Sequence, residues 1–362
     1  MADPTNGPKR HSGDNAVTAA TRRDARERAI ELLYESHTKG VDVDDILADL
    51  PLTPDAYALE LARGVTDHQI ELDAVLRRYA DAKWPVERMA VTDRTVLRLG
   101  VFELATKLDI PTGAALSEAV ELGGRYGSTD DTSRFVNGIL AAVSDEVRGS
   151  RPWTPVDVVV FDMDGVIRHW LPEHIEAEEE RLGLPTGVIS AAAFADPRFR
   201  DAMTGALTAE EWSDQIGAAV AAEHPDVTAA QVGAAWLGSN WRVDEAVVDL
   251  ARSLQAAGTT TAVFSNASST LEADMEKMGV TSLFSLVANS SRIRMAKPDV
   301  SAFEHVGSML DVSPDRLLFV DDRPENVAGA VEAGWHSVQM HSAARLGGVL
   351  RRLEIPGAPD PA

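Results

Sequence analysis

Apolar residues along the chain follow two different periods, and the change between them divides the sequence. From residue 21 to residue 148 the apolar positions recur with helical spacing. One such stripe comprises Ala25, Ala29, Ile30, Leu33 and Tyr34. After about residue 155 the pattern changes to short apolar runs that alternate with helical stretches. We therefore expect a two-domain chain, with an all-α bundle of about seven helices followed by an α/β domain with a parallel sheet.

Proline, glycine and polar residues mark the boundaries of these parts. Residues 1–20 are polar and lack an apolar period, so we expect a disordered extension there. Residues 149–155 contain glycine, serine and two prolines, which predicts a linker. The helical domain then spans residues 21–148, the α/β domain spans 156–355, and a tail covers 356–362.

The α/β part contains five apolar runs that predict strands. They are Val156–Phe161, Thr260–Phe264, Leu283–Ala288, Leu317–Val320 and Ser337–Met340. About a hundred residues between the first two runs show helical patterning and no clear strand, so we expect an inserted helical cap at about residues 168–255. Within it, Thr208 is a candidate helix cap. Four tryptophans of this segment could pack in its core or line a substrate pocket: Trp170, Trp212, Trp236 and Trp241.

Composition limits the available chemistry. The chain has no cysteine, which excludes disulfides, thiolate metal sites and cysteine nucleophiles. Its net charge of −23 argues against binding nucleic acid through bulk electrostatics, so we expect no DNA partner, and any RNA affinity must come from local clusters of basic residues. No stretch approaches the roughly 18 apolar residues that cross a bilayer, and the first residues lack the apolar centre of a secretory signal. We therefore expect a cytoplasmic protein without a membrane partner.

Polar residues follow four of the predicted strands, at the ends where open α/β sheets bind ligands. In chain order they are Asp162 and Asp164, Ser265 and Asn266, Lys297, and Asp321 and Asp322. One carboxylate can attack phosphorus, and a second can protonate the leaving oxygen. A hydroxyl and an ammonium can hold phosphoryl oxygens, and clustered carboxylates bind Mg²⁺. The pattern predicts a magnesium-dependent phosphoryl-transfer site.

This ordered set of motifs, over residues 156 to about 352, resembles the phosphatases of the haloacid dehalogenase (HAD) superfamily. The resemblance implies a Rossmann-like parallel sheet with a helical cap inserted between the first and second motifs. It implies that Asp162 is a nucleophile that forms an aspartyl phosphate and that Asp164 is the general acid and base. The remaining residues that it assigns to catalysis and substrate binding are Ser265, Asn266 and Lys297.

The same resemblance implies a metal site. Mg²⁺ would be held by Asp162, the main-chain carbonyl of Asp164 and Asp322, with Asp321 as a rival or supporting ligand. Because dehalogenases usually lack an acid at the position of Asp164, the resemblance favours a phosphatase, and its substrate would be a small phosphorylated metabolite.

The helical part carries three informative segments, Arg22–Tyr34, Trp84–Leu104 and Arg134–Leu140. Over residues 21–148 they resemble the NusB family of transcription antitermination factors. In that family the fold binds boxA RNA together with the ribosomal protein NusE. The residues that the resemblance assigns to the RNA surface are Arg22, Arg23, Arg26 and Asp131.

The residues alone leave other interpretations open. The arginines of the first helix could belong to a solvated helix face, and Arg98 could form a tie to Glu103 or Glu118. We consider three hypotheses: an RNA-binding antitermination module fused to a phosphomonoesterase, an interaction protein with a silent phosphatase site, and a phosphatase whose helical domain serves targeting or dimerisation. Within the third hypothesis, dimerisation would make the chain a homo-oligomer.

Overall fold

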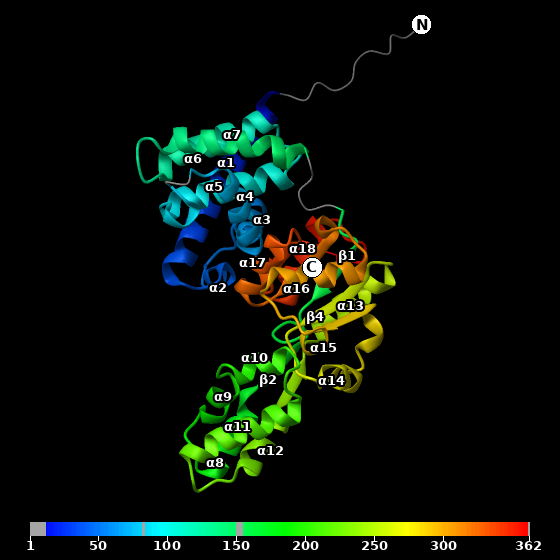
Figure 1. Cartoon of the computed structure of the whole chain (residues 1–362). Coiled ribbons are helices and arrows are strands. Elements are labelled where there is room, and N and C mark those ends of the chain that lie inside the picture. The colour runs from blue at the N-terminus through cyan, green and yellow to red at the C-terminus, as the bar shows by residue number, and fades with distance from the viewer. Residues whose placement is uncertain (1–11, 82–83, 150–154, 361–362) are drawn as a thin grey trace. The chain divides into compact units, whose positions relative to one another are not determined.

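The structure is a computed structural model that describes residues 12–81, 84–149 and 155–360. The chain divides into two compact units, Met1–Pro152 and Trp153–Ala362. Figure 1 labels the α-helices of both units and some of the strands of the second. Among the described residues, every helix is too short or too polar to cross a bilayer.

The first unit is entirely helical in its described part. Its helices are α1 (Ser12–Lys39), α2 (Val43–Ala48), α3 (Ala56–Asp67), α4 (Gln69–Tyr79), α5 (Val91–Thr106), α6 (Thr112–Tyr126) and α7 (Thr132–Gly149), with a short 3₁₀ turn at Val86–Arg88. Helix α5 is buried along most of its length and contacts α1, α3, α4, α6 and α7, so it forms the centre of the bundle. The expected all-α bundle is confirmed.

Helix α1 begins earlier than the sequence suggested. It starts at Ser12, so residues 12–20, which we expected to be disordered, are helical. This stretch contains three alanines, and extending an existing helix adds one hydrogen bond for each residue that is fixed. Residues 1–11 of the expected extension and residues 150–154 of the expected linker lie outside the described residues.

The second unit contains a five-stranded parallel sheet with the strand order β5-β4-β1-β6-β7. The strands are β1 (Val158–Phe161), β4 (Thr260–Ser265), β5 (Leu286–Asn289), β6 (Leu317–Asp321) and β7 (His336–Gln339), each near an expected strand. Phe161, the last residue of β1, pairs with Val263 of β4 and Val320 of β6. The residues that follow these three strands therefore emerge at one edge of the sheet.

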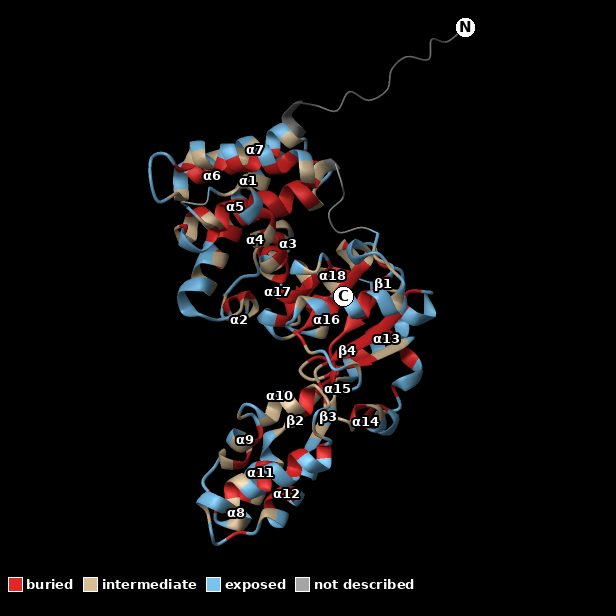
Figure 2. Cartoon of the chain, viewed as in Figure 1, coloured by how far each residue is buried: buried red, intermediate tan, exposed pale blue. Residues whose placement is uncertain are grey.

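Helices cover this sheet. They are α13 (Glu245–Ala256), α14 (Leu271–Met278), α15 (Ser290–Ile293), α16 (Val300–Leu310), α17 (Pro324–Glu332) and α18 (Ala343–Arg352). Alternate residues of β1, β4 and β6 pack with Phe303 of α16 and Ala330 of α17, while α13 contacts β4 and α18. Figure 2 shows that burial concentrates in the strands and in the helix faces turned toward them. The expected parallel α/β fold is confirmed.

A helical cap is inserted between β1 and β4. It comprises α8 (Pro172–Leu182), α9 (Val188–Ala193), α10 (Arg198–Met203), α11 (Ala209–Glu223) and α12 (Ala229–Leu237). These helices enclose a core of their own that includes Ile189, Trp212 and Ile216. Thr208 caps α11 as expected, and its hydroxyl accepts a hydrogen bond from the Glu211 amide.

The ends of the cap differ from expectation. Two short antiparallel strands, β2 (Arg168–Leu171) and β3 (Asn240–Val243), join the cap to the sheet, where we expected no strand. They contain charged and partly exposed residues, so they lack the apolar run that identifies a buried strand. Residues 245–255 were expected in the cap, but α13 buries Val247, Ala251 and Leu254 and belongs to the layer over the sheet.

Candidate active site at the edge of the sheet

Residues at the carboxyl ends of β1 and β6 meet around one buried ammonium from the loop that follows β5 and α15. Lys297 lies in the loop between α15 and α16, and its Nζ is 2.9 Å from Asp162 Oδ1 and 2.6 Å from Asp321 Oδ2. All three side chains are buried. The structure therefore brings together three of the predicted site residues, which lie up to 159 positions apart in the sequence (162 to 321).

The electrostatics of this cluster follow from burial and from an excess of carboxylates. Burial would lower the pKa of the Lys297 ammonium, but Asp162 and Asp321 outweigh burial and raise that pKa above its ordinary value. Burial raises the pKa of the Asp162 carboxyl, because the loss of solvent and the repulsion from Asp321 and Asp164 exceed the attraction of Lys297. One ammonium thus faces several carboxylates, so the site has an excess of negative charge that a bound cation would neutralise.

The residues present fit a divalent metal ion. Oxygen atoms of Asp162, Asp321 and Asp322 lie within 4.8 Å of one another. Asp322 Oδ1 is buried and has no hydrogen-bond partner among the described residues. A hard cation such as Mg²⁺ prefers oxygen ligands of this kind, and an unpaired buried oxygen is costly without one. Asp322 therefore fits the role of a direct metal ligand.

Asp321 is already fully engaged. Its carboxylate accepts hydrogen bonds from Lys297 Nζ at 2.6 Å, from the Arg323 amide at 2.8 Å and from Asn326 Nδ2 at 3.0 Å. These bonds orient Asp321 toward Lys297. Between the two aspartates that the sequence left as rivals, the geometry favours Asp322 for the metal and Asp321 for holding the lysine.

Gly165 allows the chain to pass close to Asp322. Its φ angle is 87°, and a Cβ atom at this position would lie 2.3 Å from Asp322 Oδ2. Any other residue would both strain the backbone and displace this carboxylate. The glycine that follows the Asp-x-Asp motif is thus required by the carboxylate cluster.

Ser265 and Asn266, at the end of β4, have different surroundings. Ser265 Oγ is completely buried and has no partner among the described residues, which fits a hydroxyl that donates to a bound phosphoryl oxygen. Asn266 Oδ1 accepts from the Lys297 amide and its Nδ2 donates to the Lys297 carbonyl, both at 2.8 Å. These bonds fix the lysine loop. Asn266 also lines the cavity under the cap, so its substrate contact stays a prediction.

Arg168 is a member of this site that the sequence reasoning missed. Its guanidinium donates to both oxygens of Asp164 and, at 3.0 Å, to Asp274 of α14. It also lies 4.5 Å from the ring centroid of Trp170. The spacing of four residues from Asp164 was visible in the sequence, but the turn that brings Arg168 back was not.

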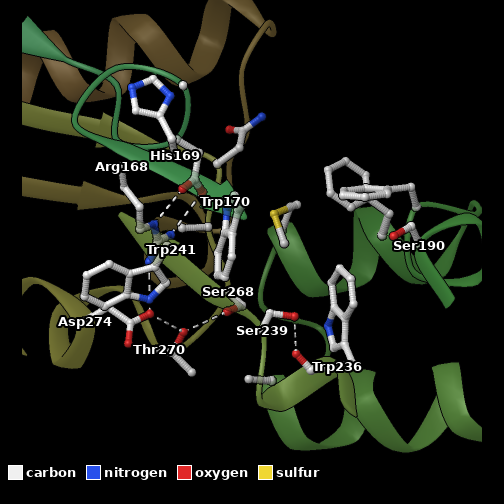
Figure 3. Close-up of a pocket in the computed structure, with 18 of the residues that line it drawn as sticks. Arg168, His169, Trp170, Ser190, Trp236, Ser239, Trp241, Ser268, Thr270 and Asp274 are labelled. Atoms are coloured by element: carbon white, nitrogen blue, oxygen red, sulfur yellow. Dashed lines mark hydrogen bonds and ion pairs between the residues drawn. The ribbon is translucent and has the colours of Figure 1, made fainter. Parts of the chain in front are cut away.

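A cavity of about 750 Å³ lies between the sheet edge and the cap. Asp162, Asp164 and Asp322 line it on the sheet side. All four tryptophans that the sequence singled out also line it, although Trp212 belongs to the cap core as well. In Figure 3, Arg168, Trp170 and Trp241 lie on one side of the cavity, and Trp236 and Ser190 project from cap helices on the other.

In the helical unit, Arg26 does not fit the predicted contact with RNA phosphate. Its side chain is only 4% exposed, and its guanidinium binds Glu103 through Nε at 2.9 Å and through a terminal nitrogen at 2.6 Å. Glu103 also accepts from Tyr57. Arg26 is a buried tie between α1 and α5, so we do not retain it as an RNA contact.

The other predicted RNA residues are more exposed, and each has a charged partner. Arg22 pairs with Asp109 at 3.0 Å, and Arg23 pairs with Glu118 and Glu121 at 2.8 Å. Asp131 is largely exposed and pairs with Arg134 at 3.0 Å.

Arg98 was expected to bind Glu103 or Glu118. It instead binds Asp73 of α4 through two hydrogen bonds of 2.7 and 2.6 Å. The two glutamates bind other arginines: Arg26 of α1 donates to Glu103, and Arg23 of α1 donates to Glu118.

Known proteins resemble both units. Residues 23–145 match the NusB family, and residues 156–334 match haloacid dehalogenase-like hydrolases. Transcription antitermination protein NusB of Kineococcus radiotolerans is 42% identical over 130 residues, which cover 35% of this chain and 94% of that protein. The NusB structure of T. maritima is 34% identical in sequence, with a TM-score of 0.33. The match covers 36% of this chain and 95% of the T. maritima chain. A structure described as a predicted HAD-like family hydrolase from Porphyromonas gingivalis is 23% identical and covers 56% of this chain and 98% of its own, with a TM-score of 0.46. The chain therefore belongs to the NusB family through its helical unit and carries a haloacid dehalogenase-like hydrolase domain in its second unit.

Proposed function

We propose that the hydrolase domain is a magnesium-dependent phosphomonoesterase that works through an aspartyl phosphate on Asp162. The observation that carries this proposal is a pair of buried oxygens without a partner among the described residues: Ser265 Oγ, at the end of β4, and Asp322 Oδ1, directly after β6. These two strands flank β1. One of them suits a phosphoryl oxygen and the other suits a metal ion. Lys297 supplies positive charge to the same site.

The reaction has two steps. An Asp162 oxygen attacks phosphorus, the ester P–O bond breaks, and the leaving oxygen takes a proton from Asp164. Asp164 then removes a proton from water, which attacks phosphorus and releases inorganic phosphate and free Asp162. Ser265 and Lys297 bind the phosphoryl oxygens in both steps. When bound to Asp162, the Asp164 carbonyl and Asp322, Mg²⁺ supplies charge that lets two anions approach.

Asp164 must exchange partners during this cycle. Its carboxylate accepts from Arg168, an arrangement that suits the ionised form. To act as an acid, Asp164 has to be protonated and to give up at least one of these hydrogen bonds. The proposal therefore requires that the bound ester turns Asp164 toward its leaving oxygen.

Hydrolysis of p-nitrophenyl phosphate with Mg²⁺ tests the proposal. We expect Asp162→Asn to abolish turnover and EDTA to abolish the activity of the parent. Asp157→Asn is the matched control, because Asp157 lies just before the same strand and pairs with Arg316 at the surface. Equal rates for Asp162→Asn and the parent would contradict the assignment of Asp162 as the nucleophile.

For the helical unit, we propose binding of a boxA-like RNA together with NusE, as part of a transcription antitermination complex. The family membership supports this role, and Arg22 and Arg23 are its remaining candidate phosphate contacts. Both arginines already pair with carboxylates, so RNA would have to displace those carboxylates. We therefore expect weak, salt-sensitive binding that NusE strengthens.

Fluorescence anisotropy with a labelled boxA-like RNA, with and without NusE, tests this role. We expect Arg22→Ala and Arg23→Ala together to weaken binding and to reduce its salt dependence. Arg28→Ala is the control on the same helix, because Arg28 is partly exposed and pairs only locally, with Glu31. If no salt-sensitive binding occurs, the alternative of a targeting or dimerisation module is favoured, and light scattering would then detect the dimer.

A further inference from the structure

We propose that the cavity accepts phosphate monoesters of uncharged alcohols that carry an aromatic ring, in preference to sugar phosphates. This inference rests on the proposed phosphatase function and names the substrate class of the same site. Three features of the cavity lining support it: its apolar surface, the pairing of its charges and the internal bonding of its polar groups.

The cavity lining presents large apolar side chains to solvent on both of its sides. Phe194 is 60% exposed, Leu237 is 51% exposed and Trp170 is 46% exposed, and all three line the cavity. Apolar side chains of this size usually stay exposed together only where a ligand or partner covers them. The exposed group thus indicates an apolar ligand surface.

These side chains continue an aromatic cluster in the cap. Phe194 makes edge-to-face contacts with Phe199 at 5.4 Å and with Trp236 at 6.0 Å, measured between ring centroids. Trp236 in turn packs on Trp212 at 5.1 Å. Because Trp212 is anchored in the cap core, the wall is held in place and is suited to contacts with another ring.

The cationic side chains of the lining are already neutralised. Among the described lining residues, Arg168 binds Asp164 and Asp274, and Lys277 also binds Asp274 at 3.1 Å. A further pair is Arg323 with Glu325 at 2.5 Å, and the His169 ring lies 3.3 Å from Asp244. A leaving group with its own carboxylate or second phosphate would meet no unpaired arginine or lysine among the lining residues that the structure describes, so its desolvation would not be compensated.

Several polar groups of the lining bond to the protein. Ser239 Oγ donates to the Trp236 carbonyl at 2.5 Å, and Trp212 Nε1 donates to the Ala193 carbonyl at 3.3 Å. On the sheet side, Ser268 and Thr270 bond to each other at 3.2 Å. A sugar would lose water from several hydroxyls and would find these groups already bonded, whereas a ring loses nothing comparable.

The size of the cavity is consistent with this class. At about 750 Å³ it is much larger than a phosphate group requires and lies in the range of pockets for drug-sized ligands. An ester with its phosphoryl group at Asp162 would therefore place its alcohol against the aromatic wall.

The test compares 2-phenylethyl phosphate with glucose 6-phosphate. Both are esters of primary alcohols, so the intrinsic reactivities of their leaving groups are similar. We expect kcat/KM to be higher for the phenylethyl ester by about tenfold or more. Phe194→Ala should reduce this ratio several-fold. Met309→Ala, an exposed apolar residue of α16 outside the cavity, should leave the ratio unchanged.

Binding without turnover separates this inference from the phosphatase proposal. By calorimetry we expect 3-phenylpropylphosphonate to bind about tenfold tighter than propylphosphonate, which lacks only the ring. A binding preference without hydrolysis of any ester would uphold the ligand class and overturn the phosphatase assignment. Equal binding of the two phosphonates, or faster hydrolysis of glucose 6-phosphate, would overturn the ligand class whether or not the enzyme is active.

Discussion

Arg168 holds the Asp164 carboxylate through two hydrogen bonds, from Nε to Oδ1 at 2.6 Å and from a terminal nitrogen to Oδ2 at 3.0 Å. Since Arg168 also binds Asp274 of α14, it joins the proposed general acid to the sheet side of the cavity. Arg168 is therefore a candidate positioning residue, which acts on the reaction through Asp164.

Replacing Arg168 should slow hydrolysis most where the leaving group needs a proton. We expect Arg168→Met to lower kcat by about 10- to 100-fold for an alkyl phosphate and by less for p-nitrophenyl phosphate, whose leaving group departs without an acid. Arg168→Lys should restore part of the loss. An equal loss for both esters would contradict the positioning role and indicate a general disturbance of the site.

Ser265→Ala should separate stability from activity. Because Ser265 Oγ has no partner among the described residues, its removal costs no hydrogen bond. We expect the free energy of unfolding to stay the same or to rise by up to about 1 kcal/mol, which would stabilise the domain. We expect kcat/KM to fall by about tenfold or more.

Ser213→Ala is the control, since Ser213 Oγ is buried and donates to the Gly233 carbonyl at 3.0 Å. Its loss should destabilise the domain by about 1 kcal/mol in urea unfolding.

Gly165→Ala should weaken magnesium binding. The new Cβ would strain the backbone and collide with the Asp322 carboxylate, so we expect the Mg²⁺ dissociation constant from calorimetry to rise by about tenfold. Gly258→Ala isolates the strain, because Gly258 has a φ of 91° and open space around a Cβ. The same loss of Mg²⁺ affinity in both variants would argue against the collision with Asp322.

Arg26→Ala should unfold the helical unit far more readily. Removal of the arginine leaves Glu103 as a buried charge without its main partner, which typically costs about 3–5 kcal/mol. The double variant Arg26→Met, Glu103→Leu should recover much of this loss, because no buried charge remains. Full stability of Arg26→Ala in chemical unfolding would show that the pair is not buried in solution.

Acid should weaken the tie between α1 and α6. The hydrogen bond from Arg23 lowers the pKa of the Glu118 carboxyl, and the charge attraction of Arg23 adds to it. The folded state therefore gains stability at a pH above the ordinary glutamate value and loses it as the pH falls through the lowered pKa. We expect Glu118→Gln to reduce the melting temperature at neutral pH, with the difference vanishing in acid. A difference that stays constant with pH would indicate lost packing instead.

Local patterns in the sequence determined much of this protein. Strand β1 could be predicted because a buried parallel strand is a continuous apolar run, and Asp162 and Asp164 were placed at its end by their positions alone. The same logic located Ser265 and Asp321, since parallel strands expose their carboxyl ends at one edge. The helical spacing of the first unit likewise predicted its fold.

Other features depend on residues that meet only after folding. Arg26 belongs to an arginine-rich helix that the sequence could not distinguish from an RNA-binding face, and only the packing of α1 on α5 buries it against Glu103. The return of Arg168 to Asp164 depends on the turn at residues 165–167, whose geometry no apolar period in the sequence predicts. Which aspartate is left for a metal depends on the bonds that Asp321 makes to Lys297 and to residues 323–326. The sequence by itself determined the elements and the reactive groups, because both are read from local order. The tertiary structure decided which charges are paired and which remain for ligands, because burial and pairing depend on distance in space.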